Sequence, residues 1–408
     1  MSTIENTSRR RARDYERDRR ASDRRGRRKI NFSLLSIGKG IDIPFVLLIL
    51  VLLAIGITMM FSASYPVAYY QNEGDSYYYL KRQLLFALIG LAIMFAISFV
   101  DYHYYHRFAL VILGLSYFAL LLVLVMPAQE GGVHRWISIG SFGIQASEIS
   151  KFAIILFLAH WGSRYYDRMD TFKFGVLPGA AVFLSTAFLL LFEPHYSCIV
   201  IIAMLTVVMM FVSGIKLKWL AIGAGLLALL IILLWVTGML TYAMERMDGW
   251  GQALNEDLDS EMWNSTWQTR NSLYAIGSGG LFGMGLGQSR QKYLYLPEPQ
   301  NDFIFAIVCE ELGLIGAVAI LLIFALLVWR GVIISLRARD RFGKLLGIGL
   351  ISHIGLQVIL NILVITDWLP NTGISLPFFS YGGSSLLTLM FEMGVILSVS
   401  RTSNIEKS

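Results

Sequence analysis

The sequence is poor in charged residues for its length. Only 15% of its 408 residues are Asp, Glu, Lys or Arg, whereas 56% are hydrophobic, and the mean hydropathy is +0.60. A water-soluble domain needs a more polar surface than this composition can supply. The composition therefore excludes a soluble globular protein and indicates a polytopic membrane protein.

Cysteine is almost absent as well. Cys198 and Cys309 both lie inside apolar segments, so neither a disulfide framework nor a metal cluster is supported. The chain also lacks an apolar segment near its beginning, because about forty polar residues come first. We therefore expect no cleavable signal peptide, and the first apolar span has to direct membrane insertion itself.

Positive charge is concentrated in the N-terminal tail. Residues 1–40 contain thirteen Lys or Arg and five acidic residues, a local net charge of +8, without hydrophobic periodicity. We expect residues 1–42 to be a basic, disordered cytoplasmic tail that sets the topology and contacts anionic membrane lipids. Nucleic-acid binding is the disfavoured alternative, because no folded element presents the arginines.

Ten apolar segments follow, each about as long as a bilayer requires. They cover residues 43–63, 83–100, 108–126, 147–162, 174–192, 196–213, 218–240, 303–329, 344–366 and 378–400. Lys and Arg gather in alternate connections, so the positive-inside rule places both termini in the cytoplasm. We predict an all-α polytopic membrane protein, with a ten-helix domain over residues 43–401 and a short cytoplasmic tail at 402–408. No internal repeat is evident, which weighs against an inverted-repeat transporter.

The longest connection, residues 241–302, is predicted to be an extracellular loop before the eighth span. It is acidic at first and rich in glycine between residues 275 and 292. Glycines such as Gly279 and Gly280 let backbone N–H groups approach a phosphate, and Arg290 and Lys292 follow them. The loop is therefore a candidate pyrophosphate site. A re-entrant segment packed through its glycines is an equally good interpretation of the loop alone.

Three carboxylates stand where this loop enters the eighth span. Asp302 lies at the predicted water boundary, and Glu310 lies about 12 Å deeper along a helix. A charge in the membrane is costly unless it is paired or used. We expect Asp302 to be the functional acid. Glu310 and Glu311 are interpreted as buried partners of Lys151 or of other groups in the bundle.

Polar motifs also open the fourth and the last span. Glu148 and Lys151 are three residues apart and can pair on one helix face, a structural role that we favour over catalysis. Residues 377–385 bring serines to the start of the last span, where helix N–H groups suit an anion such as pyrophosphate. Serines without a His and Asp relay do not indicate a hydrolase. His195, in the turn between the fifth and sixth spans, is interpreted as a loop residue.

Six short motifs occur in a fixed order along the chain. They are Arg135-Trp136 with Gly140, Gln145 to Glu148 with Lys151, Ser278 to Gly280 with Gly285 and Gly287, Leu296 to Glu298 leading into Asp302, Glu310-Glu311 with Gly313, and Leu376 to Ser385. Over residues 43–400 the chain resembles the SEDS proteins (shape, elongation, division and sporulation) of bacterial cell-wall synthesis. It is most similar to the division-type FtsW branch, with the RodA and sporulation branches close behind.

This resemblance implies a peptidoglycan glycosyltransferase that polymerises lipid II at the outer face of the cytoplasmic membrane, at the division septum. Inverting glycosyl transfer needs a base at the acceptor oxygen and charge stabilisation at the leaving group. The resemblance makes Asp302 the key acid, and we expect it to be the base. The residues expected to bind substrate are Arg135, Trp136, Gln145, Ser147, Lys151, Gly279, Gly280, Arg290, Lys292, Glu298, Ser380 and Ser384.

The resemblance also implies partners. A single-span class B penicillin-binding protein, a transpeptidase, is expected beside the chain, together with other division proteins. A divalent cation, Mg²⁺ or Mn²⁺, could assist at the pyrophosphate, and no organic cofactor is expected.

Three positions depart from the family pattern: Ala146 replaces the usual Pro, His195 the usual Asp, and Asn301 the usual Thr. Because the second change removes an acid, we assign no catalytic role to position 195. Two other function classes stay open. A lipid II flippase should line a path across the bilayer with polar groups, whereas the motifs here crowd the outer face. A non-catalytic division scaffold would not depend on Asp302.

Overall fold

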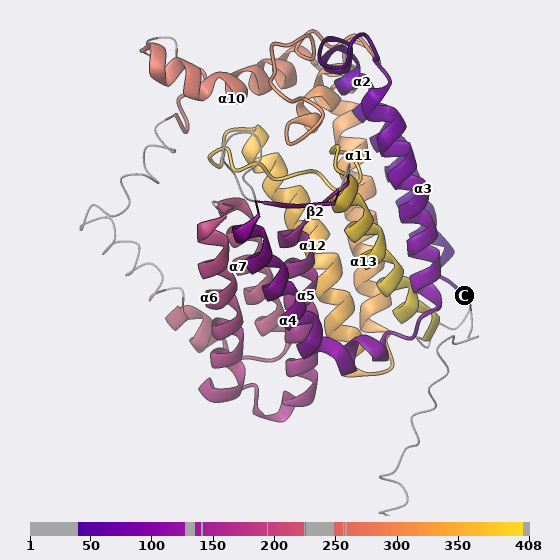
Figure 1. Cartoon of the computed structure of the whole chain (residues 1–408), viewed down its shortest axis with the longest axis vertical. Helices are drawn as coiled ribbons and strands as arrows, with labels where there is room; N and C mark the ends of the chain where they lie inside the picture. The colour runs from indigo at the N-terminus through magenta and orange to yellow at the C-terminus, as the bar shows by residue number, and fades with distance from the viewer. Residues whose placement is uncertain are drawn as a thin grey trace, which may run out of the picture. The chain divides into compact units, whose positions relative to one another are not determined.

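A computed structural model describes residues 40–126, 135–139, 142–193, 195–223, 225, 249–255, 257 and 259–402 (Figure 1). The predicted terminal tails fall almost entirely outside these residues. The helices are α2 (Ile43–Gln71), α3 (Tyr78–Phe99), α4 (His103–Val125), α5 (Ala146–Arg164), α6 (Leu177–Phe192), α7 (Tyr196–Val212), α10 (Ser260–Ser278), α11 (Ile304–Leu336), α12 (Arg341–Ile365) and α13 (Gly383–Thr402). Two short turns, η1 (Tyr166–Arg168) and η2 (Phe172–Val176), connect α5 to α6.

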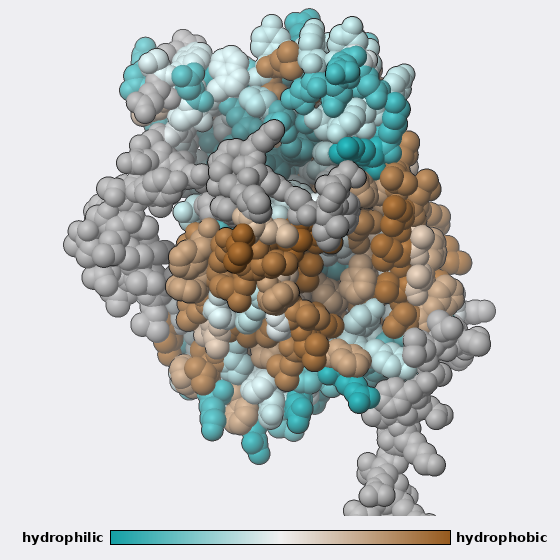
Figure 2. All heavy atoms as spheres, viewed as in Figure 1, coloured by the Kyte–Doolittle hydropathy of each residue, from teal (hydrophilic) through white to brown (hydrophobic). Residues whose placement is uncertain are grey.

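Seven helical segments among the described residues are long and apolar enough to cross a bilayer. They are α2, α3, α4, Phe172–Phe192, α11, α12 and α13. Figure 2 shows a brown apolar belt over these helices, between polar teal ends. The chain is therefore a multi-pass membrane protein, as predicted. The fourth and sixth predicted spans coincide with α5 and the 17-residue α7. The span predicted at 218–240 lies mostly outside the described residues, so the count of ten and the sidedness of the termini stay predictions.

Helices α12 and α13 form the centre of the bundle. Their apolar windows are 61% and 72% buried, whereas the corresponding value is 28–39% for the other five segments. Helix α12 packs against α5, α7 and α11, and α13 packs against α3. Nearly every residue in the first three turns of α5 is buried, including Glu148 and Lys151. The charges of α5 therefore lie inside the protein rather than against lipid.

Two outer segments predicted as loops contain regular structure. Strands β1 (Trp136–Ile139) and β2 (Phe142–Gln145) form an antiparallel hairpin in which Trp136 is opposite Gln145. Helix α10 lies within the predicted loop 241–302 and packs against α11. It begins at Asp259, whose side chain accepts a hydrogen bond of 2.8 Å from the N–H of Met262. This capping signal is local, but the mixed composition of residues 260–278 hides the helix from a search for apolar segments.

The glycine-rich segment after α10 packs directly on a break in α11. Gly313 interrupts the helix with φ 67° and ψ −173°, a backbone region that is open essentially only to glycine. A Cβ atom at Gly313 would lie 2.2 Å from the backbone nitrogen of Gly283, and one at Gly279 would lie 2.0 Å from the carbonyl oxygen of Cys309. Glycine at these positions permits direct contact between two backbone segments. Of the two interpretations of the glycine-rich loop, the structure therefore agrees with a segment that packs through its glycines.

The substitution Gly313→Ala should destabilise the protein by about 3 kcal/mol, through backbone strain and the collision with Gly283. Thermal unfolding of purified protein in detergent measures the effect. Gly277→Ala is the matched control, because Gly277 is a helical glycine with no atom within 4 Å of the added methyl group. Equal melting temperatures for the two variants would contradict this account of the break.

Candidate active site

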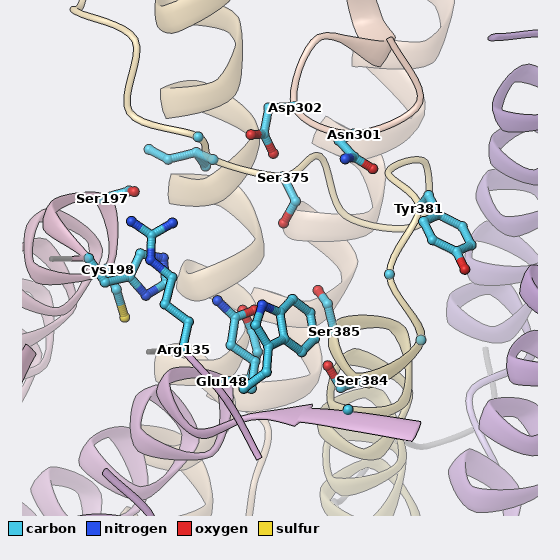
Figure 3. A pocket seen from close by; sticks show the side chains of 18 of the residues that line it. Arg135, Glu148, Ser197, Cys198, Asn301, Asp302, Ser375, Tyr381, Ser384 and Ser385 are labelled. Carbon is cyan, nitrogen blue, oxygen red and sulfur yellow. The ribbon is translucent and has the colours of Figure 1, made fainter. Parts of the chain in front are cut away.

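A cavity of about 790 Å³ lies where several loops meet the helical bundle (Figure 3). Its size matches that of sites for small-molecule ligands. Segments distant in the sequence contribute its walls: α3, the hairpin, α5, the start of α7, the residue pair before α11, α12, and both the loop and the first turn of α13.

Seven residues singled out from the sequence line this cavity. They are Arg135, Trp136, Gln145, Glu148, Lys151, Asp302 and Ser384. The other nine do not line it: Ser147, Gly279, Gly280, Arg290, Lys292, Glu298, Ser380, Glu310 and Glu311. The structure thus brings together the hairpin, the start of α5 and the acid before α11, and leaves the glycine-rich loop outside.

The backbone of Asp302 is anchored on two sides. The buried side chain of Asn361 on α12 donates from Nδ2 to the carbonyl oxygens of Asp302 and Ile374, both at 2.7 Å. The Ser380 hydroxyl donates to the carbonyl oxygen of Asn301 at 2.8 Å. Gly373, with φ 68°, faces the carboxylate, and a Cβ atom there would lie 3.1 Å from Oδ2 of Asp302. Ser380 therefore acts on the backbone beside Asp302 rather than in the cavity.

The pKa of Asp302 is raised to about 6, mainly by burial and also by the nearby Glu298, while Arg135 acts in the opposite direction. Asp302 is only partly accessible on the cavity wall, which explains why burial is the largest cause of its raised pKa. A carboxylate with a pKa near the working pH is well suited to accept and release a proton.

Three cations line the same cavity as this acid. Arg82, Arg135 and Lys151 line the wall together with two carboxylates, Glu148 and Asp302. Lys151 is buried and donates to Glu148 at 2.8 Å, so the pair predicted on one face of α5 is present. Figure 3 shows Arg135 reaching from the hairpin toward the cavity. This wall suits an anionic ligand group such as a pyrophosphate.

The backbone N–H groups of the glycine-rich loop bind carboxylates of the protein itself. The N–H of Gly287 donates to Oε2 of Glu311 at 2.9 Å, and that of Arg290 donates to Oε1 of Glu310 at 2.9 Å. Lys292 donates from Nζ to Glu311 at 2.8 Å. Glu310 and Glu311 are thus buried partners of other groups, the second of the two alternatives predicted for them. Lys151 is not one of these partners, because it bonds to Glu148, and Lys292 lies beside Glu311.

Comparison with known proteins agrees with these motifs. The FtsW/RodA/SpoVE family model, described as a cell cycle protein, matches residues 43–405. The chain belongs to this family. It is 42% identical to the stage V sporulation protein E of Bacillus subtilis, over 89% of this chain and 97% of that protein. It is 36% identical to a probable peptidoglycan glycosyltransferase FtsW of Trichlorobacter lovleyi, over 88% of this chain and 93% of that protein.

Two solved structures share the fold of this family member. The rod shape determining protein RodA of Thermus thermophilus superposes with a TM-score of 0.65 at 25% identity, covering 90% of this chain and 99% of that one. A chain from a peptidoglycan synthase complex that coordinates polymerization and crosslinking gives a TM-score of 0.71 at 24% identity, with the same coverage. The resemblance inferred from the six motifs is confirmed at the level of family and fold.

Sequence reasoning missed several cavity residues of this FtsW/RodA/SpoVE chain. Arg82 on α3 and Gln357 on α12 carried no motif signal, and Tyr381, inside the motif from Leu376 to Ser385, was given no role. His195, interpreted as a loop residue, lines the same cavity. Asn361, whose side chain binds the backbone of Asp302, is one of two buried amides in an apolar span, together with Gln357. A polar residue at that depth is the signal that could have identified it.

The substitution Lys292→Met should destabilise the protein by about 3–5 kcal/mol, because it leaves the carboxylate of Glu311 buried without its cation. Adding Glu311→Gln should restore much of the loss, and thermal unfolding in detergent measures both. Lys81→Met is the control, since its 2.9 Å pair with Asp75 is exposed and should contribute little. A Lys292→Met protein that melts like the Lys81→Met protein would exclude this role for the buried pair.

Proposed function

We propose that this protein is a peptidoglycan glycosyltransferase that polymerises lipid II at the outer face of the bacterial cytoplasmic membrane. The observation that carries the proposal is the position of Asp302. Its backbone is anchored, and its carboxyl group has a raised pKa in a cavity that Arg135 and Lys151 also line. Family membership supports it, as do the relatives named probable peptidoglycan glycosyltransferase FtsW.

The reaction joins two lipid-linked disaccharides. Asp302 takes the proton from the 4-hydroxyl group of the acceptor sugar, and that oxygen forms the new bond to the anomeric carbon of the donor. The bond from this carbon to the pyrophosphate breaks, and the polyprenyl pyrophosphate leaves with the electron pair. Arg135 and Lys151, joined by Arg82 on α3, stabilise the negative charge of the leaving group.

The hairpin supplies the next contacts. Its pairing sets Trp136 beside Gln145, and both side chains line the cavity. An indole ring can pack on a sugar face, while the Gln145 amide can hydrogen-bond to hydroxyl groups. Ser384 provides a hydroxyl group from the first turn of α13. We assign these three residues to the sugar headgroups.

A divalent cation belongs to this proposal as an ion carried by the pyrophosphate. The described residues contain no group of three or more His, Cys, Asp or Glu that could hold a metal. Mg²⁺ commonly binds through one or two carboxylates plus substrate phosphates. Glu148 is engaged with Lys151, so Asp302 is the cavity carboxylate that fits such an ion. When bound, the ion would neutralise charge on the pyrophosphate.

The proposed partner is a transpeptidase, a class B penicillin-binding protein, that crosslinks the new strands. The structural relative from a complex that coordinates polymerization and crosslinking supports it. We place the protein at the division septum with other division proteins, on the strength of its relatives named FtsW. The relative named for sporulation favours a second candidate role, cell-wall synthesis during sporulation, by the same chemistry.

Replacing Asp302 with Asn should lower the rate of lipid II polymerisation by about 10²–10⁴-fold, the contribution expected of a general base. Purified protein and labelled lipid II, with and without the transpeptidase, measure the rate from glycan strand length. Asp75→Asn, at an exposed carboxylate, should retain full activity. Full activity of the Asp302→Asn protein would exclude the assignment, and flipping of lipid II without polymerisation by the wild type would favour a flippase.

The rate should also depend on pH in the direction set by Asp302. A base with a pKa of about 6 is protonated and inactive below that pH, so kcat/KM should rise as pH increases through about 6. Initial polymerisation rates between pH 5 and 8 test this, with the melting temperature recorded at each pH. A stable protein whose rate is unchanged from pH 5 to pH 7 would contradict the role of base.

A further inference from the structure

His195 lies in the turn between α6 and α7 and lines the cavity. Its side chain is nine-tenths buried, with 9% relative exposure. Both backbone polar groups of His195 are hydrogen-bonded: its N–H donates to the carbonyl oxygen of Leu190 at 3.3 Å, and its carbonyl oxygen accepts from the N–H of Ile199 at 3.4 Å. The ring nitrogen Nδ1, in contrast, has no hydrogen-bond partner among the residues that the structure describes.

A buried polar atom without a partner is rare in folded proteins, because leaving it unpaired costs free energy. His195 is not enclosed in an apolar core, where such an atom would simply be a defect. It lines the space into which the substrate is proposed to bind. The unpaired Nδ1 is therefore a hydrogen-bonding group that the described residues leave unsatisfied beside this space.

The charges around His195 restrict the nature of that partner. The pKa of His195 is lowered to about 3, mainly by burial and also by Arg135 and Lys151, while Glu148 acts in the opposite direction. The ring is thus neutral at physiological pH, with one nitrogen as a donor and the other as an acceptor. Such a ring matches a hydroxyl or an amide. The cations beside it match the pyrophosphate.

A second neutral group of the same kind stands in the cavity. Ser384 is 4% exposed, and its hydroxyl oxygen has no hydrogen-bond partner within the described ranges. Figure 3 shows Ser384 on α13, on the opposite side of the view from Ser197 and Cys198 at the start of α7. Unpaired neutral groups therefore occur on two separate walls, which is what a ligand with hydroxyl and amide groups requires.

We propose that His195 is a substrate-binding residue that hydrogen-bonds through Nδ1 to a hydroxyl group or the N-acetyl amide of the sugar headgroup. This inference rests on the proposed function and names a contact that the reaction itself does not require. His195 contributes to holding the neutral sugar, whereas Asp302 moves the proton. Its loss should therefore weaken binding more than it slows the chemical step.

The test compares two replacements of His195. Leu removes the hydrogen bond, and Asn keeps a polar atom near the position of Nδ1. His195→Leu should raise KM for lipid II about tenfold, as expected for one lost hydrogen bond to a buried neutral group, while kcat stays within about threefold. His195→Asn should keep KM within about threefold of wild type, because the contact is retained. A wild-type KM for His195→Leu would overturn the proposal. An Asn variant as impaired as Leu would do so too, because the role would then be structural.

Two further measurements separate an effect on substrate binding from effects on catalytic turnover and on folding. The Kd of lipid II for the Asp302→Asn protein in nanodiscs should increase about tenfold when His195→Leu is added, and an unchanged Kd would contradict the inference. This binding test stands even if the wild type does not polymerise lipid II, an outcome that would reject only the proposed function. Thr206→Val is the control on α7, since its buried hydroxyl bonds to Ile202 away from the cavity. If His195→Leu does not fold, His195→Ala replaces it in both measurements.

Discussion

Two buried carboxylates, Glu310 and Glu311, bind the glycine-rich loop to α11. Each accepts hydrogen bonds from backbone N–H groups of residues 287–291, and Lys292 adds its ammonium group to Glu311. A carboxylate at this depth needs such partners, because lipid supplies none. The loop that satisfies them continues directly into Asp302. The place of the proposed catalytic acid therefore depends on how these two charges are buried.

The three acids at this junction illustrate three ways of accommodating a charge. Glu311 has a cation and Glu310 has amide and hydroxyl donors, whereas the carboxylate of Asp302 has neither among the residues that the structure describes. Paired carboxylates hold the structure together and are unavailable for proton transfer. Asp302 instead keeps a raised pKa beside an accessible cavity, while Asn361 holds its backbone. Environment, rather than residue type, separates the two structural acids from the acid proposed to be reactive.

The cavity is lined by both charged and neutral polar side chains. Arg135 and Lys151 suit the pyrophosphate of a lipid-linked donor, whereas His195 and Ser384 offer hydrogen-bonding groups without net charge. A substrate with an anionic linker and neutral sugars needs both kinds of contact. Their arrangement follows from the bundle, since α12 and α13 bring α5, α7 and the hairpin to one place.

Much of this protein follows from the sequence alone, because the signals involved are local. Apolar segments predicted the membrane helices, the spacing of Glu148 and Lys151 predicted their pair, and an acid at the edge of an apolar span identified Asp302. The glycine-rich loop shows what local sequence patterns do not determine. Its N–H groups were suited to an anion, but only the fold decided that this anion is Glu310 and Glu311 rather than a pyrophosphate. The fold likewise placed Arg82 and His195 in the cavity and Asn361 behind Asp302. Each of these contacts joins segments far apart in the chain, and their meeting depends on helix packing that no short pattern encodes.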